Sequence, residues 1–370
     1  MSTPFRLLTT QDVEAWQTAL PSDVCVMGGL EFARVQERHL GQPARLFVVG
    51  SAACRIVYPF FLRGIPGQPL EWDTVTPEYT GPILLGPETG ALSEACFRDF
   101  REGFSEFCHA TGIVAEFAHL NPWNARTDLL DAASMELNRE IIYVDLTLGE
   151  EGIWKHSLSS DTRRQTRQAH DAGVVVRAAE SEEDVLAFHR LHHQTMERLS
   201  AQEQYYVTRE YFLDIFASMP RNAVFMLSEY QGRTVAGGLY FQDATNVYWH
   251  LSALDMEFAK VRPVNAYHFE MLKRSCLAGK QHLLCGGAHR SGDGVFRFKA
   301  GFSPLRIPFW IYKRIHDPER YAALTEAWFR RHPGLVAEPG FFPAYRSGTP
   351  DPADTDKSRV PSVSGPDPES

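Results

Sequence analysis

The chain has 370 residues, 44% of them hydrophobic and 12% aromatic, which is enough apolar material for more than one hydrophobic core. Its formal net charge of −9 argues against a protein that wraps nucleic acid over its whole surface, and no double-stranded DNA partner is expected. No apolar run reaches the roughly 18 residues of a membrane span, and the first residues lack a signal-peptide pattern. With six cysteines and no CxxC pair, we expect a reduced, cytoplasmic protein without a metal site.

The first half of the chain reads as alternating strands and helices. Residues 46–64 have the pattern of strand, tight turn, strand. A helix is predicted over 92–112, because large apolar side chains recur at helical spacing and Gly112 marks its end. The apolar stretch 113–122 after that glycine is predicted to be a strand.

The second half repeats this order after a connecting stretch. Residues 139–176 read as strand, loop, basic helix and strand, and Ser181 with Asp184 forms a capping box at the start of a helix over 181–200. Residues 224–242 form a second strand-turn-strand pattern with its turn at Gln231-Gly232. A helix over 265–279 and a strand over 282–287 follow.

The repetition indicates an α/β (α+β) chain built from two modules of similar topology, each a mixed twisted sheet flanked by helices. We expect a first domain over 1–145, completed by 316–345, and a second over 146–315. Residues 346–370 are rich in Pro, Ser and Asp and are expected to be a disordered tail. The alternative is one large irregular α/β domain.

Several short stretches have a composition that suits a binding site. The helix over 181–200 has a core-facing stripe that turns polar, and tyrosines follow it. The strand 246–254 is expected to place Tyr248 and His250 on one face and Trp249 and Leu251 on the other. Residues 294–304, GVFRFKAGFSP, read as a buried strand and turn that carries a lysine. The alternative for residues 181–200 is an ordinary amphipathic helix. The alternative for the lysine is a surface side chain whose stem lies along apolar groups while its charge stays in water.

Taken in order, WKHSLSSDTRRQTRQAHDAGVVV, TMERL, REYF, GRTVAGGLYF, YWHLSAL, CGG and FRFKAGF resemble the Fem family of non-ribosomal peptidyltransferases. The resemblance covers roughly residues 20–345 and is clearest over 139–313. It implies two tandem GNAT-like domains that move an amino acid from aminoacyl-tRNA, as co-substrate and without another cofactor, to an amine. It also places Phe298 and Lys299 at the reaction centre, where an ammonium group stabilises the negative charge that develops on the carbonyl oxygen of the ester.

The same resemblance implies the remaining site residues. Arg198 matches the position of an arginine that holds an anionic acceptor; the other candidates for substrate binding are Thr195, Tyr206, Tyr248, His250, Gly286 and Gly287. The basic residues that would contact tRNA phosphates are Arg163, Arg164, Arg167, Lys313 and Arg314. A solvated basic helix is the alternative for the three arginines.

The acceptor is a small amine or peptide. A cell-wall (peptidoglycan) precursor would need a basic residue in the first domain for its diphosphate, and only Arg34 and Arg45 are candidates, so antibiotic biosynthesis is favoured. Two other functions stay open: an acyl-CoA-dependent GNAT N-acyltransferase, and a non-catalytic GNAT-fold binding protein. The stretch LDMEFAKVRPVNAYHF lacks the glycines that cradle a pyrophosphate, and Pro263 removes a donor, so we expect acetyl-CoA not to bind.

Overall fold

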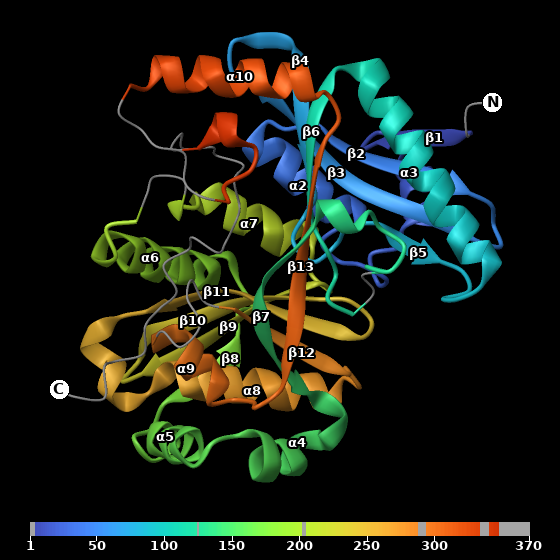
Figure 1. Cartoon of the computed structure of the whole chain (residues 1–370). Helices are drawn as coiled ribbons and strands as arrows, with labels where there is room; N and C mark the ends of the chain where they lie inside the picture. The colour runs from blue at the N-terminus through green and yellow to red at the C-terminus, as the bar shows by residue number, and fades with distance from the viewer. Residues whose placement is uncertain (1–3, 124–125, 202–204, 288–293, 334–339, 348–370) are drawn as a thin grey trace. The chain divides into compact units, whose positions relative to one another are not determined.

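The computed structural model describes residues 4–123, 126–201, 205–287, 294–333 and 340–347. It divides into two compact units (Figure 1). The first unit runs to Asn138 and resumes at Phe309, and the second runs from Arg139 to Pro308. None of the helices in these residues is both long and apolar enough to cross a membrane.

The first unit contains a mixed sheet. Its strand order is β1 (Phe5–Thr9), β2 (Ala44–Gly50), β3 (Arg55–Ile65), β4 (Gln68–Val75), β6 (Ile113–His119) and β13 (Arg306–Ile315), with β5 (Ile83–Leu85) beside β3. Neighbouring strands are antiparallel except β4 and β6, which are parallel. A parallel pair needs a long crossover connection, and α3 (Ala91–Thr111) supplies it.

Helices cover both faces of this sheet. The phenylalanines of α3 pack on one face against Phe47, Tyr58 and Phe60, with ring centroids 4.9–5.4 Å from Phe104. On the other face, α10 (Pro318–Arg331) packs against Ile65 and Val114. The unit also contains α1 (Val13–Ala19), α2 (Leu30–Leu40) and the 3₁₀ turns η1 (Ala132–Ser134) and η6 (Ala344–Arg346).

The second unit contains another mixed sheet. Its strand order is β7 (Met135–Asp145), β12 (His282–Gly286), β11 (Asn246–Leu254), β10 (Arg233–Gln242), β9 (Ala223–Tyr230) and β8 (Val175–Ala178). Its helical segments are η2 (Leu146–Leu148), α4 (Gly149–Gly152), the π-helical η3 (Ile153–Ser157), α5 (Ser160–Asp171), α6 (Glu182–Arg198), α7 (Arg209–Ser218), η5 (Met256–Val261), α8 (Pro263–Leu277) and α9 (Gly294–Ala300). The parallel pair is β11 and β12, joined by α8.

Two adjacent glycines of β10 let helices approach both faces of this sheet. A Cβ atom at Gly237 would lie 2.8 Å from Cδ2 of Phe188 on α6, and one at Gly238 would lie 2.7 Å from Cε2 of Tyr267 on α8. Successive residues of a strand point to opposite faces, so α6 and α8 lie on opposite sides of the sheet (Figure 1). The glycines therefore fix how closely both helices pack.

The two sheets share one topology. In each, a run of antiparallel strands leads to one parallel pair, followed by one further antiparallel strand: β13 in the first unit and β7 in the second. The expectation of two α/β modules of similar topology is confirmed. The boundaries expected at 145 and 315 are the C-terminal ends of β7 and β13, and the division between the units falls inside these two strands.

Local sequence signals that depend on neighbours in the chain are confirmed. Gln231 and Gly232 form the hairpin turn with φ of 51° and 74°, Ser181 and Asp184 form the capping box, and Gly112 ends α3 at φ 71°. Each of these signals depends on hydrogen bonds within a few residues, so no tertiary contact is needed to specify it.

Two expectations are wrong. The stretch predicted as a strand and turn is the helix α9, and its apolar residues Val295, Phe298 and Phe302 recur at helical spacing. The prediction failed because the seven residues of the helix also satisfy the alternating pattern of a strand. The expected disordered tail does not begin at residue 346, since Arg346 and Ser347 are 6% and 3% exposed. Residues 348–370 lie outside the described residues.

Candidate functional site

The parallel strands β11 and β12 pair over a short length only. Their ladder consists of three residue pairs, from Asn246–His282 to Tyr248–Leu284. Directly beyond it each strand carries a bulge: Leu239 and Tyr240 pair with Leu251 and Trp249, and the β12–β7 register shifts between Leu284 and Gly286. Beyond this ladder β11 continues to Leu254 without pairing to β12, and we call the place where the two strands cease to pair the fork. Bulges redirect strands and side chains near functional sites.

The equivalent strands of the first unit stay paired. The β4–β6 ladder runs from Trp72–Ile113 to Val75–Phe117, and a further parallel bridge joins Thr80 to Leu120. The fork is therefore a property of the second unit, although both units share one topology.

Trp249 is the first residue of β11 beyond the ladder with β12. Its ring stacks on the imidazole of His268 from α8, with centroids 3.9 Å apart and planes 24° apart. The bulge at His250 places Leu251 on the face opposite Trp249, so the expectation that these two side chains share a face is wrong. Tyr248 is the cross-strand partner of Phe241, and the His250 ring packs against the Phe241 ring with centroids 4.5 Å apart. The expectation that Tyr248 and His250 share a face is therefore confirmed.

His268, on which the Trp249 ring stacks, lies next to two other buried polar groups. Its Nδ1 lies 2.7 Å from the Tyr240 hydroxyl, and its Nε2 lies 3.7 Å from Sγ of Cys285. Burial, and secondarily the Lys299 ammonium, lowers the pKa of His268 to about 3, and burial raises the pKa of Cys285 to about 12. These shifts favour a neutral imidazole and a neutral thiol near pH 7, and a neutral thiol is a poor nucleophile.

Lys299 lies beside this group on α9. Its Nζ donates a hydrogen bond of 2.6 Å to the carbonyl oxygen of Gly287 and lies 6.0 Å from the centroid of the Trp249 ring. Phe298 contacts the same indole, with ring centroids 6.3 Å apart. The structure thus brings together the predicted catalytic pair and the segment that follows β12.

The two glycines at the end of β12 have the geometry expected from the sequence. Gly286 has φ of 76°, in the left-handed region, and a Cβ atom at Gly287 would lie 2.6 Å from Cδ of Arg139. Residues 288–293, which connect this segment to α9, lie outside the described residues.

The other predicted substrate-binding residues occupy different environments. Thr195 is completely buried, donates to the Leu191 carbonyl at 2.8 Å and accepts from the Leu254 amide at 3.2 Å, so its hydroxyl fastens α6 to β11. Tyr248 donates to Asp243 at 3.0 Å. Arg198 is exposed at the end of α6, and the half-buried Tyr206 packs edge-on against His193 at 5.3 Å.

The predicted tRNA-binding residues divide between the units. In the second unit, Arg163 donates to the carbonyls of Leu158 (2.6 Å) and Trp154 (3.2 Å) and so caps η3. The exposed Arg164 guanidinium lies 3.3 Å from the Asp161 carboxylate. The Arg167 guanidinium, also exposed, lies 5.1 Å from the centroid of the Trp154 ring.

Lys313 and Arg314 belong to β13 of the first unit. Lys313 donates to the Glu136 carboxylate at 2.7 Å and to the Gly340 carbonyl at 2.8 Å, and Arg314 donates to the Tyr312 hydroxyl at 3.3 Å. These contacts give both side chains a structural role in that unit.

Sequence reasoning missed Trp249, His268, Tyr240 and Cys285 as members of the site. The signal for His268 was present, because it lies in the apolar stripe Tyr267, Met271 and Leu272 of the helix expected over 265–279. A buried imidazole needs hydrogen-bond partners, which is a reason to search for them. No side-chain group suited to hold a metal ion, with three or more His, Cys, Asp or Glu, occurs in the described part of the chain.

Two buried histidines predict a pH dependence of stability. Burial lowers the pKa of both His192 and His268 to about 3, against about 6.5 in the unfolded chain. The unfolded state therefore binds more protons as the pH falls from about 6.5 towards 3, and the free energy of unfolding decreases by up to about 1.4 kcal/mol per pH unit for each imidazole. Urea unfolding at pH 7 and pH 5 measures this loss, and His192→Leu is expected to reduce it.

Imidazole NMR signals supply the direct check. Both side chains are expected to remain neutral at pH 5 in the folded chain. Titration of either signal near pH 6.5, with the fold intact, would contradict the prediction.

Comparison with known proteins supports the fold. Residues 156–300, which include Trp249, His268 and Lys299, match the family model of the acetyltransferase (GNAT) domain. No curated protein matches the chain significantly. The chain thus has a mixed α/β fold of the GNAT acyltransferase type.

Solved structures extend the likeness beyond that domain. The crystal structure of FemX is 13% identical, covers 86% of this chain and 99% of its own, and superposes with a TM-score of 0.68. The C-terminal domain of a protein from Agrobacterium fabrum described as a lysylphosphatidylglycerol synthetase is 16% identical, with coverages of 86% and 96% and a TM-score of 0.53. A conserved protein of unknown function from Bacteroides thetaiotaomicron is 12% identical, with coverages of 85% and 99% and a TM-score of 0.53. At these identities the likeness is one of fold.

Proposed function

We propose that this chain is an aminoacyltransferase that moves an amino acid from aminoacyl-tRNA to the amine of a small molecule or peptide. The observation that carries the proposal is the ammonium group of Lys299, which the Gly287 carbonyl holds at 2.6 Å beside the fork of a GNAT-type sheet. An ammonium that is fixed before the reaction stabilises developing negative charge without reorganisation.

The proposed step needs no covalent enzyme intermediate. The amine nitrogen of the acceptor attacks the ester carbonyl carbon, and the carbonyl oxygen gains the negative charge that Lys299 stabilises. The carbonyl re-forms, the carbon–oxygen ester bond breaks, and the ribose oxygen leaves with the electron pair. The proton lost by the amine ends on that oxygen, so the products are an amide and a tRNA with a free hydroxyl group.

The acceptor we propose is a small amine or short peptide of antibiotic biosynthesis and not a peptidoglycan precursor. Both candidates for a diphosphate contact are engaged with backbone: Arg34 donates to the Thr10 carbonyl at 2.9 Å, and Arg45 donates to the Ala44 carbonyl at 2.8 Å. The proposed place of the reaction is the cytoplasm, where charged tRNA is made.

The proposal is supported by the match of residues 156–300 to the GNAT domain and by the fold shared with FemX. The test is incubation of the purified chain with a mixture of radiolabelled aminoacyl-tRNAs and candidate amines. Label is expected to move to an amine in an amide bond that resists mild alkali, which hydrolyses the tRNA ester. If no label moves to any amine, the transferase proposal fails.

An acyl-CoA-dependent N-acyltransferase is the second candidate, because the matched domain is named for acetyl transfer. The start of α8, which follows β11, argues against this candidate: Arg262 precedes the helix at φ 55°, and Pro263 opens it without an N–H group. We therefore predict no tight binding of acetyl-CoA. Calorimetry that shows tight, saturable binding would favour the second candidate.

A further inference from the structure

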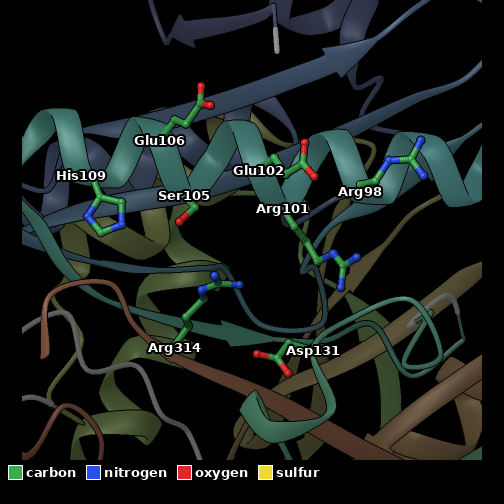
Figure 2. A pocket seen from close by; sticks show the side chains of 8 residues that line it. All are labelled: Arg98, Arg101, Glu102, Ser105, Glu106, His109, Asp131 and Arg314. Atoms are coloured by element: carbon green, nitrogen blue, oxygen red, sulfur yellow. The ribbon is translucent and has the colours of Figure 1, made fainter. Parts of the chain in front are cut away.

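The first unit contains a pocket of about 480 Å³ beside α3 (Figure 2). Arg101 of α3 and Arg314 of β13 extend into the space from opposite sides, Ser105 and His109 of α3 point into it, and Asp131 lies on the wall below. The volume lies within the range of ligand pockets, which is roughly 300–1,000 Å³. No part of this pocket belongs to the site around Lys299.

The two guanidiniums that converge here differ in how they are held. Arg314 is fixed by its hydrogen bond of 3.3 Å to the Tyr312 hydroxyl. Arg101 is half-buried, its Nε has no hydrogen-bond partner, and no described residue forms an ion pair with its side chain. A partly buried guanidinium without a counter-charge suits an anionic ligand oxygen in the pocket, which would accept hydrogen bonds from its terminal N–H groups.

The acidic residues of the pocket restrict the ligand. Asp131 accepts hydrogen bonds from the Ala133 amide at 3.1 Å and the Ser134 hydroxyl at 3.2 Å, which hold its carboxylate in place. Glu102 and Glu106 also line the pocket, and together with Arg98 they balance its charge at three arginines against three carboxylates. A polyanion such as a nucleic acid would meet these carboxylates, whereas a small ligand with one anionic and one donor group would match both kinds of charge.

We propose that this pocket binds a small molecule through one anionic group, a phosphate or a carboxylate, held between Arg101 and Arg314, with a hydrogen-bond donor of the same molecule facing Asp131. The proposal concerns the first unit alone. It is therefore independent of the proposed aminoacyl transfer.

The test uses three probes on the full chain: phosphoethanolamine, β-alanine and inorganic phosphate. Isothermal calorimetry is expected to show saturable binding of phosphoethanolamine or of β-alanine. Binding of the first identifies the anionic group as a phosphate, and binding of the second identifies it as a carboxylate. Inorganic phosphate, which lacks an amine, is expected to bind more weakly than the better of these two. Asp131→Asn is expected to remove that difference in affinity.

Two arginine variants locate the site. Arg101→Gln and Arg314→Gln are each expected to lower the affinity at least tenfold, whereas Arg330→Gln, an exposed arginine of α10 in the same unit, leaves it unchanged. If Arg314→Gln lowers the melting temperature, the affinity of Arg101→Gln is the deciding measurement, because Nε of Arg101 has no hydrogen-bond partner in the folded chain. Absence of saturable binding for all three probes, or equal affinity of Arg101→Gln and the unchanged chain, overturns the proposal. Lys299→Ala is expected to leave probe binding intact, so this site and the transfer site fail independently.

Discussion

Replacing Lys299 by alanine is expected to lower kcat for aminoacyl transfer about 10²–10³-fold, the usual effect of removing one preorganised oxyanion donor. The ammonium lies beside the Trp249 ring and is oriented by the Gly287 carbonyl, so its charge is fixed before the substrate arrives. Loss of that charge leaves the developing oxyanion without compensation. Single-turnover transfer from labelled aminoacyl-tRNA measures the effect on the chemical step.

The fold is expected to survive this change. Lys299 is half-buried, and the core of the second unit consists of apolar side chains from the sheet, α8 and the π-helical turn, so the alanine variant should keep its circular dichroism spectrum and melting temperature. Lys155→Ala, which removes an exposed lysine paired with Glu151, is the matched control and should transfer at the unchanged rate. Equal rates for Lys299→Ala and the unchanged chain would remove Lys299 from the reaction centre.

The sequence predicted those parts of the fold that local interactions specify. The turn at Gln231-Gly232, the capping box at Ser181 and the helix end at Gly112 each form within a few residues, and the order of strands and helices revealed the repeated topology. The resemblance implied that Lys299 and Gly287 belong to one site, and in the structure a hydrogen bond of 2.6 Å joins them.

The remainder depends on contacts that distant residues make. The bulges in β11 and β12 arise from pairing with β10 and β7, so an alternating pattern within one strand placed Leu251 on the wrong face. The group of Tyr240, His268 and Cys285 forms only when β10, α8 and β12 pack together. The seven residues of α9 are too few to separate helical from alternating periodicity.

A buried ion-pair network in the first unit shows the same dependence on distant residues. The Asp73 carboxylate is 0% exposed and accepts from Nε of Arg63 at 2.6 Å and from Nε of Arg346 at 2.7 Å. Tyr345 donates to the same carboxylate at 3.2 Å, and Arg346 also donates to the Gly64 carbonyl at 2.8 Å. These bonds fasten the segment around η6 to β3 and β4, although the composition after residue 345 is that of a disordered tail.

Asp73→Ala is expected to lower the free energy of unfolding by about 3–5 kcal/mol, because it leaves two buried guanidiniums without their shared counter-charge. Arg346→Met is expected to cost less, since the pair between Arg63 and Asp73 remains and a thioether replaces the removed charge. Glu326→Ala, which removes an exposed i,i+4 pair with Arg330, is the surface control and should change stability by less than about 1 kcal/mol. Urea unfolding of the three variants tests this order. A loss for Asp73→Ala no larger than that of the surface control would mean that the buried charges are solvated in the folded chain, and that η6 is held by the packing of Tyr345 against α10 instead.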